Sequence, residues 1–76
     1  MTQHEWRITF ANNLLCILRE KGVSQAQLAR DAGLSTSRIS EYINAITTPT
    51  IFAIINMAYT LDMDVDELVD FDSRVV

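Results

Sequence analysis

The sequence has almost none of the residues that build cross-links or metal centres. It contains one cysteine and one histidine among its 76 residues. A single cysteine cannot form an internal disulfide, and one Cys with one His falls short of the three or four ligands of a zinc site. We therefore expect no bound metal, and the lack of disulfides favours a reducing, cytoplasmic setting.

The usual residues of catalytic chemistry are missing as well. Cys16 stands within the apolar residues 14–18, and the only histidine that could activate it as a nucleophile is His4, near the chain end. Residues 62–66 carry aspartates at the first, third and fifth positions of a calcium loop, but Glu67 stands where that loop requires glycine. We therefore expect no enzymatic activity, no cofactor and no small-molecule substrate.

Chain breakers and long apolar runs are also scarce. The only glycines are Gly22 and Gly33, and the only proline is Pro49. No apolar run approaches the ~20 residues of a membrane span, and the first residues lack the pattern of a signal peptide. Because 49% of the residues are hydrophobic, a small core can form. We expect one domain over residues 1–76, with a short tail at 70–76 and no membrane association.

The charge is unevenly distributed along the chain. Six Lys/Arg against ten Asp/Glu give a net charge of −4. Residues 1–50 hold five cations and four anions (5 − 4 = +1), whereas residues 51–76 hold one cation and six anions (1 − 6 = −5). The folded chain can therefore present a near-neutral or mildly basic face to a partner while its acidic end points away.

Apolar periodicity predicts five helices and no strand. The first, over residues 5–21, has an apolar stripe and ends at Gly22. The fourth begins near residues 48–50, with Pro49 in its first turn, and the short fifth is capped by Asp64 with Glu67 at its third position. The first stripe consists of Trp6, Phe10, Leu14, Ile17 and Leu18.

Residues 24–44 predict the second and third helices, joined by a tight turn. Ser24 and Gln27 fit a capping box, Gly33 ends the second helix, and Ser35 caps the third. The third helix has an apolar face and an opposite face of short, mostly uncharged polar side chains that suit hydrogen bonding. The apolar face is Ile39, Tyr42 and Ile43, and the polar face is Thr36, Ser37, Arg38, Ser40, Glu41 and Asn44. This geometry is that of a helix-turn-helix.

An ordered set of residues then resembles a known family. The set is Ser24-Gln25, Leu28-Ala29, Gly33-Leu34-Ser35, Ile39-Ser40, Asn44 and Pro49, followed by Ala58, Leu61 and residues 64–68. It is similar to the lambda-repressor/Cro-like, or XRE-type, helix-turn-helix domain over residues 8–70. The resemblance implies an all-α, compact five-helix fold and a sequence-specific transcriptional regulator, a repressor of phage or mobile-element type, whose partner is a double-stranded DNA operator.

The resemblance also implies roles for individual residues. Members of the family lay the second motif helix in the major groove of DNA. The positions that would contact bases are Thr36, Ser37, Arg38, Ser40 and Glu41. The positions that would contact the DNA backbone are Gln25, Ser35, Asn44 and Thr47.

The chain departs from the family pattern at two places. Ala45 stands where glycine is common, and Ile46 and Thr47 stand where Lys or Arg is common, so this loop offers less phosphate neutralisation. A buried Glu–Arg pair of the family is replaced on both sides, by Ile43 and Leu18, which leaves no charge stranded. The uncharged loop leaves an alternative function open: a protein-interaction module, antirepressor or antitoxin-like, with weak or no DNA binding.

Apolar residues in the C-terminal third exceed what so small a domain buries easily. They indicate either a core with a disordered tail or a two-fold homodimer interface. The interface residues we predict are Phe52, Ile55, Met63, Val69 and Phe71. A dimer would place two recognition helices in successive major grooves, ~34 Å apart, on a near-palindromic site.

Overall fold

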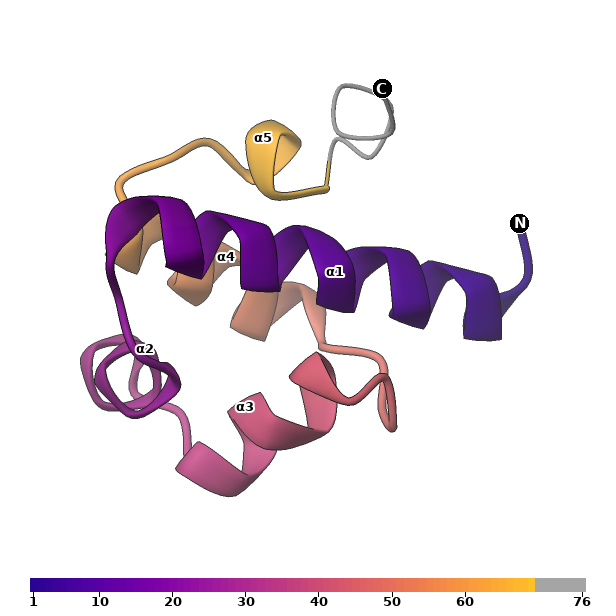
Figure 1. The fold of residues 1–76 in the computed structure, drawn as a ribbon, viewed down its shortest axis with the longest axis horizontal. Helices are drawn as coiled ribbons and strands as arrows, with labels where there is room; N and C mark the ends of the chain where they lie inside the picture. The colour runs from indigo at the N-terminus through magenta and orange to yellow at the C-terminus, as the bar shows by residue number, and fades with distance from the viewer. Residues whose placement is uncertain (70–76) are drawn as a thin grey trace.

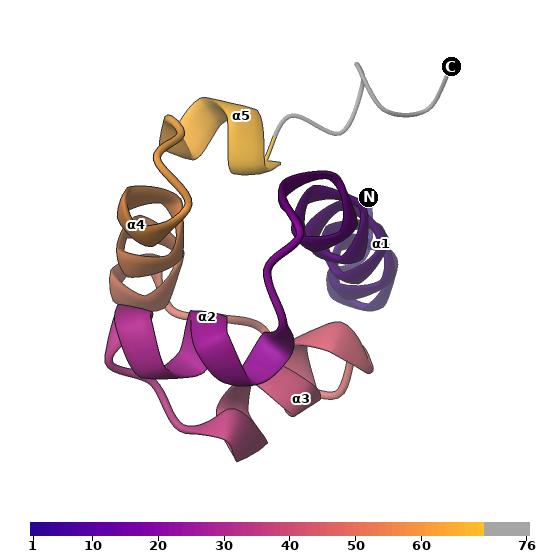
Figure 2. The ribbon, with the colours of Figure 1, turned by 60° about the vertical axis from the view of Figure 1, so that its left-hand side comes forward.

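A computed structural model of the chain describes residues 1–69 as five helices, which confirms the predicted all-α fold. They are α1 (Gln3–Lys21), α2 (Gln25–Ala32), α3 (Thr36–Ile43), α4 (Ile51–Thr60) and α5 (Val65–Val69). In Figure 1, α1 crosses the molecule with α5 on one side and α3 on the other. Viewed nearly along α1, the other four helices curve around a shared interior (Figure 2).

The helix starts follow local capping, with three differences from the sequence prediction. Helix α1 begins two residues earlier than predicted because Thr2 and Glu5 form a complete capping box, with both reciprocal hydrogen bonds. Placing Pro49 in the first turn of α4 was wrong, since Thr50 is the N-cap and its hydroxyl accepts from the Ala53 amide at 3.1 Å. At α5 only half of the predicted cap forms within the described residues: the backbone amide of Asp64 donates to the Glu67 carboxylate at 3.4 Å, but the Asp64 carboxylate accepts from no helix amide.

Helices α1 to α4 end in the same way, with one residue in the left-handed conformation. These residues are Gly22 (φ 66°), Gly33 (φ 71°), Ala45 (φ 58°) and Asp62 (φ 55°). At each end, the amide of the following residue donates to the carbonyl five positions earlier, at 2.8 to 3.0 Å, as in a Schellman motif. Two of the four ends therefore use glycine, and Ala45 adopts a backbone conformation that disfavours a Cβ atom.

The core draws side chains from every helix, with α3 packed against α1 and with α2 packed against α3 and α4. The largest fully buried side chains are Phe10, Leu14, Ile17, Leu28, Ile39, Met57 and Leu68. Trp6 extends this core along α1 by stacking on Phe10, with ring centroids 5.1 Å apart. Leu18 is buried and Ile43 packs against the core, so apolar contacts fill the two positions where many members of the resembled family carry an ion pair.

One buried polar side chain joins α1 to α5. Asn13 is 4% exposed, and its Nδ2 donates to the carbonyl oxygen of Leu68. Its Oδ1 has no hydrogen-bond partner among residues 1–69. Within the same residues, no helix combines the length and hydropathy that crossing a membrane requires.

Candidate nucleic-acid interface

Residues 24–44 form the predicted helix-turn-helix, and its inner faces are fixed by burial. Ile39 and Tyr42 of α3 are 0% and 4% exposed, and they lie in the same core cluster as Leu28 of α2. The turn between the helices is closed by the left-handed Gly33. Because one face of α3 is anchored in the core, its opposite face is held at a defined orientation on the surface.

Serine hydroxyls begin both helices of the motif. The Ser24 hydroxyl accepts from the Gln27 amide at 3.0 Å, and the Ser35 hydroxyl accepts from the Arg38 amide at 3.0 Å. These bonds confirm the two predicted N-caps. At Ser24 only this half of the predicted capping box forms, because the Gln27 side chain makes no return bond to the Ser24 amide within the described residues.

Thr36 and Ser37 are the most available side chains on the outer face of α3. Both are exposed in its first turn, and neither hydroxyl has a hydrogen-bond partner in the part of the chain that the structure describes. A hydroxyl can donate one hydrogen bond and accept others, so this pair can bind polar groups of either kind.

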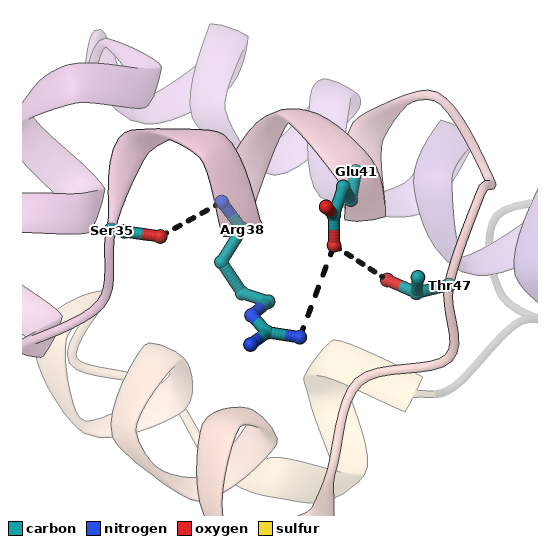
Figure 3. Close-up of polar contacts among 4 residues, drawn as sticks. All are labelled: Ser35, Arg38, Glu41 and Thr47. Atoms are coloured by element: carbon teal, nitrogen blue, oxygen red, sulfur yellow. Dashed lines mark hydrogen bonds and ion pairs between the residues drawn. The ribbon is translucent and has the colours of Figure 1, made fainter.

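Arg38 and Glu41 neutralise each other on the same face (Figure 3). The Arg38 Nη1 lies 3.9 Å from the Glu41 Oε1, and this carboxylate oxygen also accepts from the Thr47 hydroxyl at 3.4 Å. The two charged side chains are 58% and 39% exposed, so water screens the pair and it contributes at most ~1 kcal/mol. An incoming anion can therefore compete with Glu41 for the guanidinium.

Ser40 and Asn44 are engaged with each other at the end of α3. The Asn44 Nδ2 donates to the Ser40 carbonyl at 2.8 Å and to the Ser40 hydroxyl at 3.3 Å. Ser40 is half-buried, whereas Asn44 is exposed. Of the five positions that the resemblance assigns to base contacts, Thr36 and Ser37 are therefore the ones with unengaged side chains.

Gln25 begins α2 beside a cation that the sequence interpretation did not include. Gln25 is exposed and lines a shallow groove with Arg19 of α1 and with Ser24. The turn at Gly22 brings α1 and α2 together here, so the six-residue spacing between Arg19 and Gln25 is the signal that could have predicted their proximity.

The apolar surface lies mainly on α4. The predicted interface residues Phe52 and Ile55 are 70% and 48% exposed, whereas Met63 and Val69 pack partly against the core. Phe71 and the predicted tail, residues 70–76, lie outside the described residues. Two residues absent from the prediction, Ile51 and Tyr59, are 67% and 88% exposed on α4.

Comparisons with known proteins agree with this geometry. A family model described as helix-turn-helix, HTH_3, matches residues 17–68. The crystal structure of an HTH_3 family transcriptional regulator from Vibrio cholerae matches 97% of this chain with a TM-score of 0.87 and 20% sequence identity, a level that shows a shared fold. This chain spans 42% of the length of that chain. No curated protein sequence matches significantly. Because the family model covers well over half of its residues, the chain belongs to the HTH_3 helix-turn-helix family.

Proposed function

We propose that the protein is a sequence-specific transcriptional regulator that inserts α3 into the major groove of double-stranded DNA. The observation that carries this proposal is the pair of free hydroxyls of Thr36 and Ser37 at the N-terminal end of a helix anchored in the core. The N-terminal residues of a recognition helix are the ones that reach base edges, and Ser or Thr can donate to or accept from them.

Four further positions suit contacts to the sugar-phosphate backbone. Gln25 is the first residue of α2, and at a helix N-terminus the first amides have no partner within the helix and the dipole favours a phosphate. Ser35 uses its oxygen as an acceptor within the cap, which leaves its hydroxyl hydrogen to donate. Asn44 and Thr47 border the far end of α3. Together they would bracket the recognition helix and set its register on DNA.

A homodimer through α4 is part of this proposal. Ile51, Ile55 and Tyr59 recur every four residues and so form one stripe, with Phe52 beside it. No residue of α4 carries a charge, so two copies can pack there without the repulsion that a net charge of −4 otherwise causes. Figure 2 places α4 and α3 on different sides of the molecule, which allows both functions at once.

Such a dimer would act as a repressor of phage or mobile-element type by occupying an operator. Two copies of α3 would read two half-sites about one helical turn of DNA apart. Repression of this kind requires only occupation of the site, and the phage-type assignment is carried over from the resemblance to Cro-like domains.

Selection of bound sequences from a random duplex pool tests the DNA-binding proposal directly. We expect a near-palindromic site, and we expect the double variant Thr36→Ala with Ser37→Ala to lose the preference for it. Asn12→Ala, at an exposed position of α1, is the control and retains the preference. Equal affinity of the wild-type protein for the selected site and for random duplex at physiological salt would refute the proposal.

The dimer is tested by sedimentation equilibrium with Ile55→Lys. Ile55 is 48% exposed, so the substitution leaves the core intact while it places a charge on the apolar stripe. We expect a monomer that binds a full operator more weakly but a single half-site unchanged. Ala26→Lys, at an exposed position of α2, should leave the association state as it is.

The alternative, a protein-interaction module, is favoured by an acidic groove at the C-terminal end of α4. Asp62, Asp64 and Glu67 line it with Tyr59 and Met63, which suits a basic partner. That function predicts DNA binding that is weak and insensitive to salt. A logarithmic salt dependence with a slope of several ions per dimer excludes it, because such a slope counts neutralised phosphates.

A further inference from the structure

Two side chains of α1 reach the loop that follows the recognition helix. The Arg7 Nε donates to the Thr48 hydroxyl oxygen at 2.8 Å, and the Gln3 Nε2 donates to the same oxygen at 3.2 Å. These residues lie 41 and 45 positions from Thr48 in the sequence. Figure 1 shows the N-terminal half of α1 passing beside the connection between α3 and α4.

We propose that Arg7 binds a backbone phosphate of DNA next to the site of α3, an inference that rests on the DNA-binding function proposed above. Thr48 immediately follows Thr47, one of the positions assigned to backbone contacts. The Arg7 guanidinium, bonded to Thr48, therefore lies at the edge of the proposed DNA-binding surface around α3. The loop itself, residues 45–48, contains no cation, and Arg7 supplies from α1 the positive charge that the loop lacks.

The hydrogen bond to Thr48 leaves the phosphate-binding part of the guanidinium available. Arginine has five N–H donors, and this bond uses the one on Nε. The Nη groups of Arg7 make no hydrogen bond or ion pair within residues 1–69. Arg7 is half-buried, and the bond at Nε already restricts its side chain. Binding a phosphate would therefore cost little additional side-chain entropy.

Charge pairing distinguishes Arg7 from the arginines of the motif. Arg30 lies 3.7 Å from the Asp31 carboxylate, and Arg38 lies 3.9 Å from that of Glu41. Among the described residues, Arg7 has no carboxylate within the 4.0 Å of an ion pair. Its full positive charge is therefore available to neutralise a phosphate.

The experiment compares Arg7→Gln with the wild-type protein over a range of salt concentrations, on the duplex selected from the random pool and on random duplex. We expect the slope of log affinity against log salt to fall in magnitude by ~0.9 per chain, and affinity at 0.15 M salt to fall roughly fivefold for each chain that contacts the duplex, on both duplexes. The ratio of the two affinities should stay unchanged, because a phosphate contact carries no sequence information.

Three further variants separate charge, position and folding. Arg7→Lys should keep the salt slope, and Thr48→Val should keep the slope but weaken both affinities. Arg30→Gln, which removes an equal charge from an arginine already paired with Asp31, should change the slope less than Arg7→Gln does. Far-UV circular dichroism checks that each variant is folded.

The outcomes distinguish the two proposals. If the wild-type protein prefers its selected duplex and Arg7→Gln binds both duplexes with an unchanged slope, the role of Arg7 is refuted and the proposed function stands. Equal losses in Arg7→Gln and Arg30→Gln would also refute it, since net charge alone would then explain them. A wild-type protein that binds neither duplex overturns both proposals together.

Discussion

Replacing Glu41 by glutamine should strengthen DNA binding. Glu41 holds its carboxylate 3.9 Å from the only cation of α3, Arg38, and therefore brings the charge of the recognition face close to zero. The substitution removes the negative charge but keeps a carbonyl oxygen that can accept from the Thr47 hydroxyl, as the carboxylate does now at 3.4 Å. The local geometry should survive while Arg38 becomes free.

The size of the effect follows from the exposure of the pair. Because the two side chains are 58% and 39% exposed and lie three positions apart on one helix, losing the pair should cost less than ~0.5 kcal/mol of folding stability. Freeing Arg38 adds about one neutralised phosphate per chain. We therefore expect the salt slope to steepen by ~0.9 per chain and affinity for random duplex at 0.15 M salt to rise roughly fivefold for each chain that contacts it.

Fluorescence anisotropy titrations of labelled duplexes at several salt concentrations measure both quantities. The matched control is Asp31→Asn, which makes the same charge change in the exposed Arg30–Asp31 pair of α2, where the charged atoms lie 3.7 Å apart. The control should change the slope less. If both variants steepen the slope equally, net charge explains the gain and Arg38 does not face DNA. If Glu41→Gln leaves the slope unchanged, the reasoning from the ion pair is wrong.

Three predictions concern stability. Ala45→Gly should raise the free energy of unfolding by ~0.5–1 kcal/mol and the melting temperature by a few degrees, because alanine is strained in the left-handed conformation at φ 58° and glycine is not. The control, Ala26→Gly in α2, should lower the free energy of unfolding by ~1 kcal/mol. Asn13→Ala should lower the free energy of unfolding by ~1–3 kcal/mol, because the buried carbonyl of Leu68 loses its hydrogen-bond donor. Urea denaturation measures this change. Burial raises the pKa of Tyr42 above its usual 10.0. The neutral Tyr42 side chain therefore contributes fully to folding stability below pH 10, and this contribution is lost as the pH rises through the folded-state pKa. Tyr42→Phe should reduce the loss of stability at alkaline pH, as measured by denaturation curves.

Local signals in the sequence predicted the parts of the structure that local interactions determine. Ser35 is an N-cap because its hydroxyl needs only the amide three residues ahead, and Gly33 ends α2 because glycine alone adopts φ 71° without strain. The same reasoning, applied to Thr2 and Glu5, would have predicted the capping box that begins α1. That signal was present in the sequence and was missed.

Contacts between distant segments could not be predicted in this way. The bond between Arg7 and Thr48 joins residues 41 positions apart, and it exists because α1 packs across α3 in the folded core. No periodicity in α1 distinguishes Arg7 from the other polar residues of that helix. The exposure of Tyr59 likewise depends on which face of α4 packs against the core. Because α4 has apolar residues on all sides, its sequence does not indicate which face is buried.

The loop after α3 shows why the uncharged sequence there is compatible with a binding surface. Ala45 fixes its start through the Schellman motif, Glu41 of α3 holds Thr47, and Arg7 of α1 holds Thr48. Each of these anchors comes from backbone or side chains outside residues 46–48, so the loop needs no cation of its own to keep its shape. Since two of the anchoring side chains are charged, the electrostatic character of this surface is determined by α1 and α3. A count of charges within the loop therefore underestimates what the folded surface can offer to a phosphate.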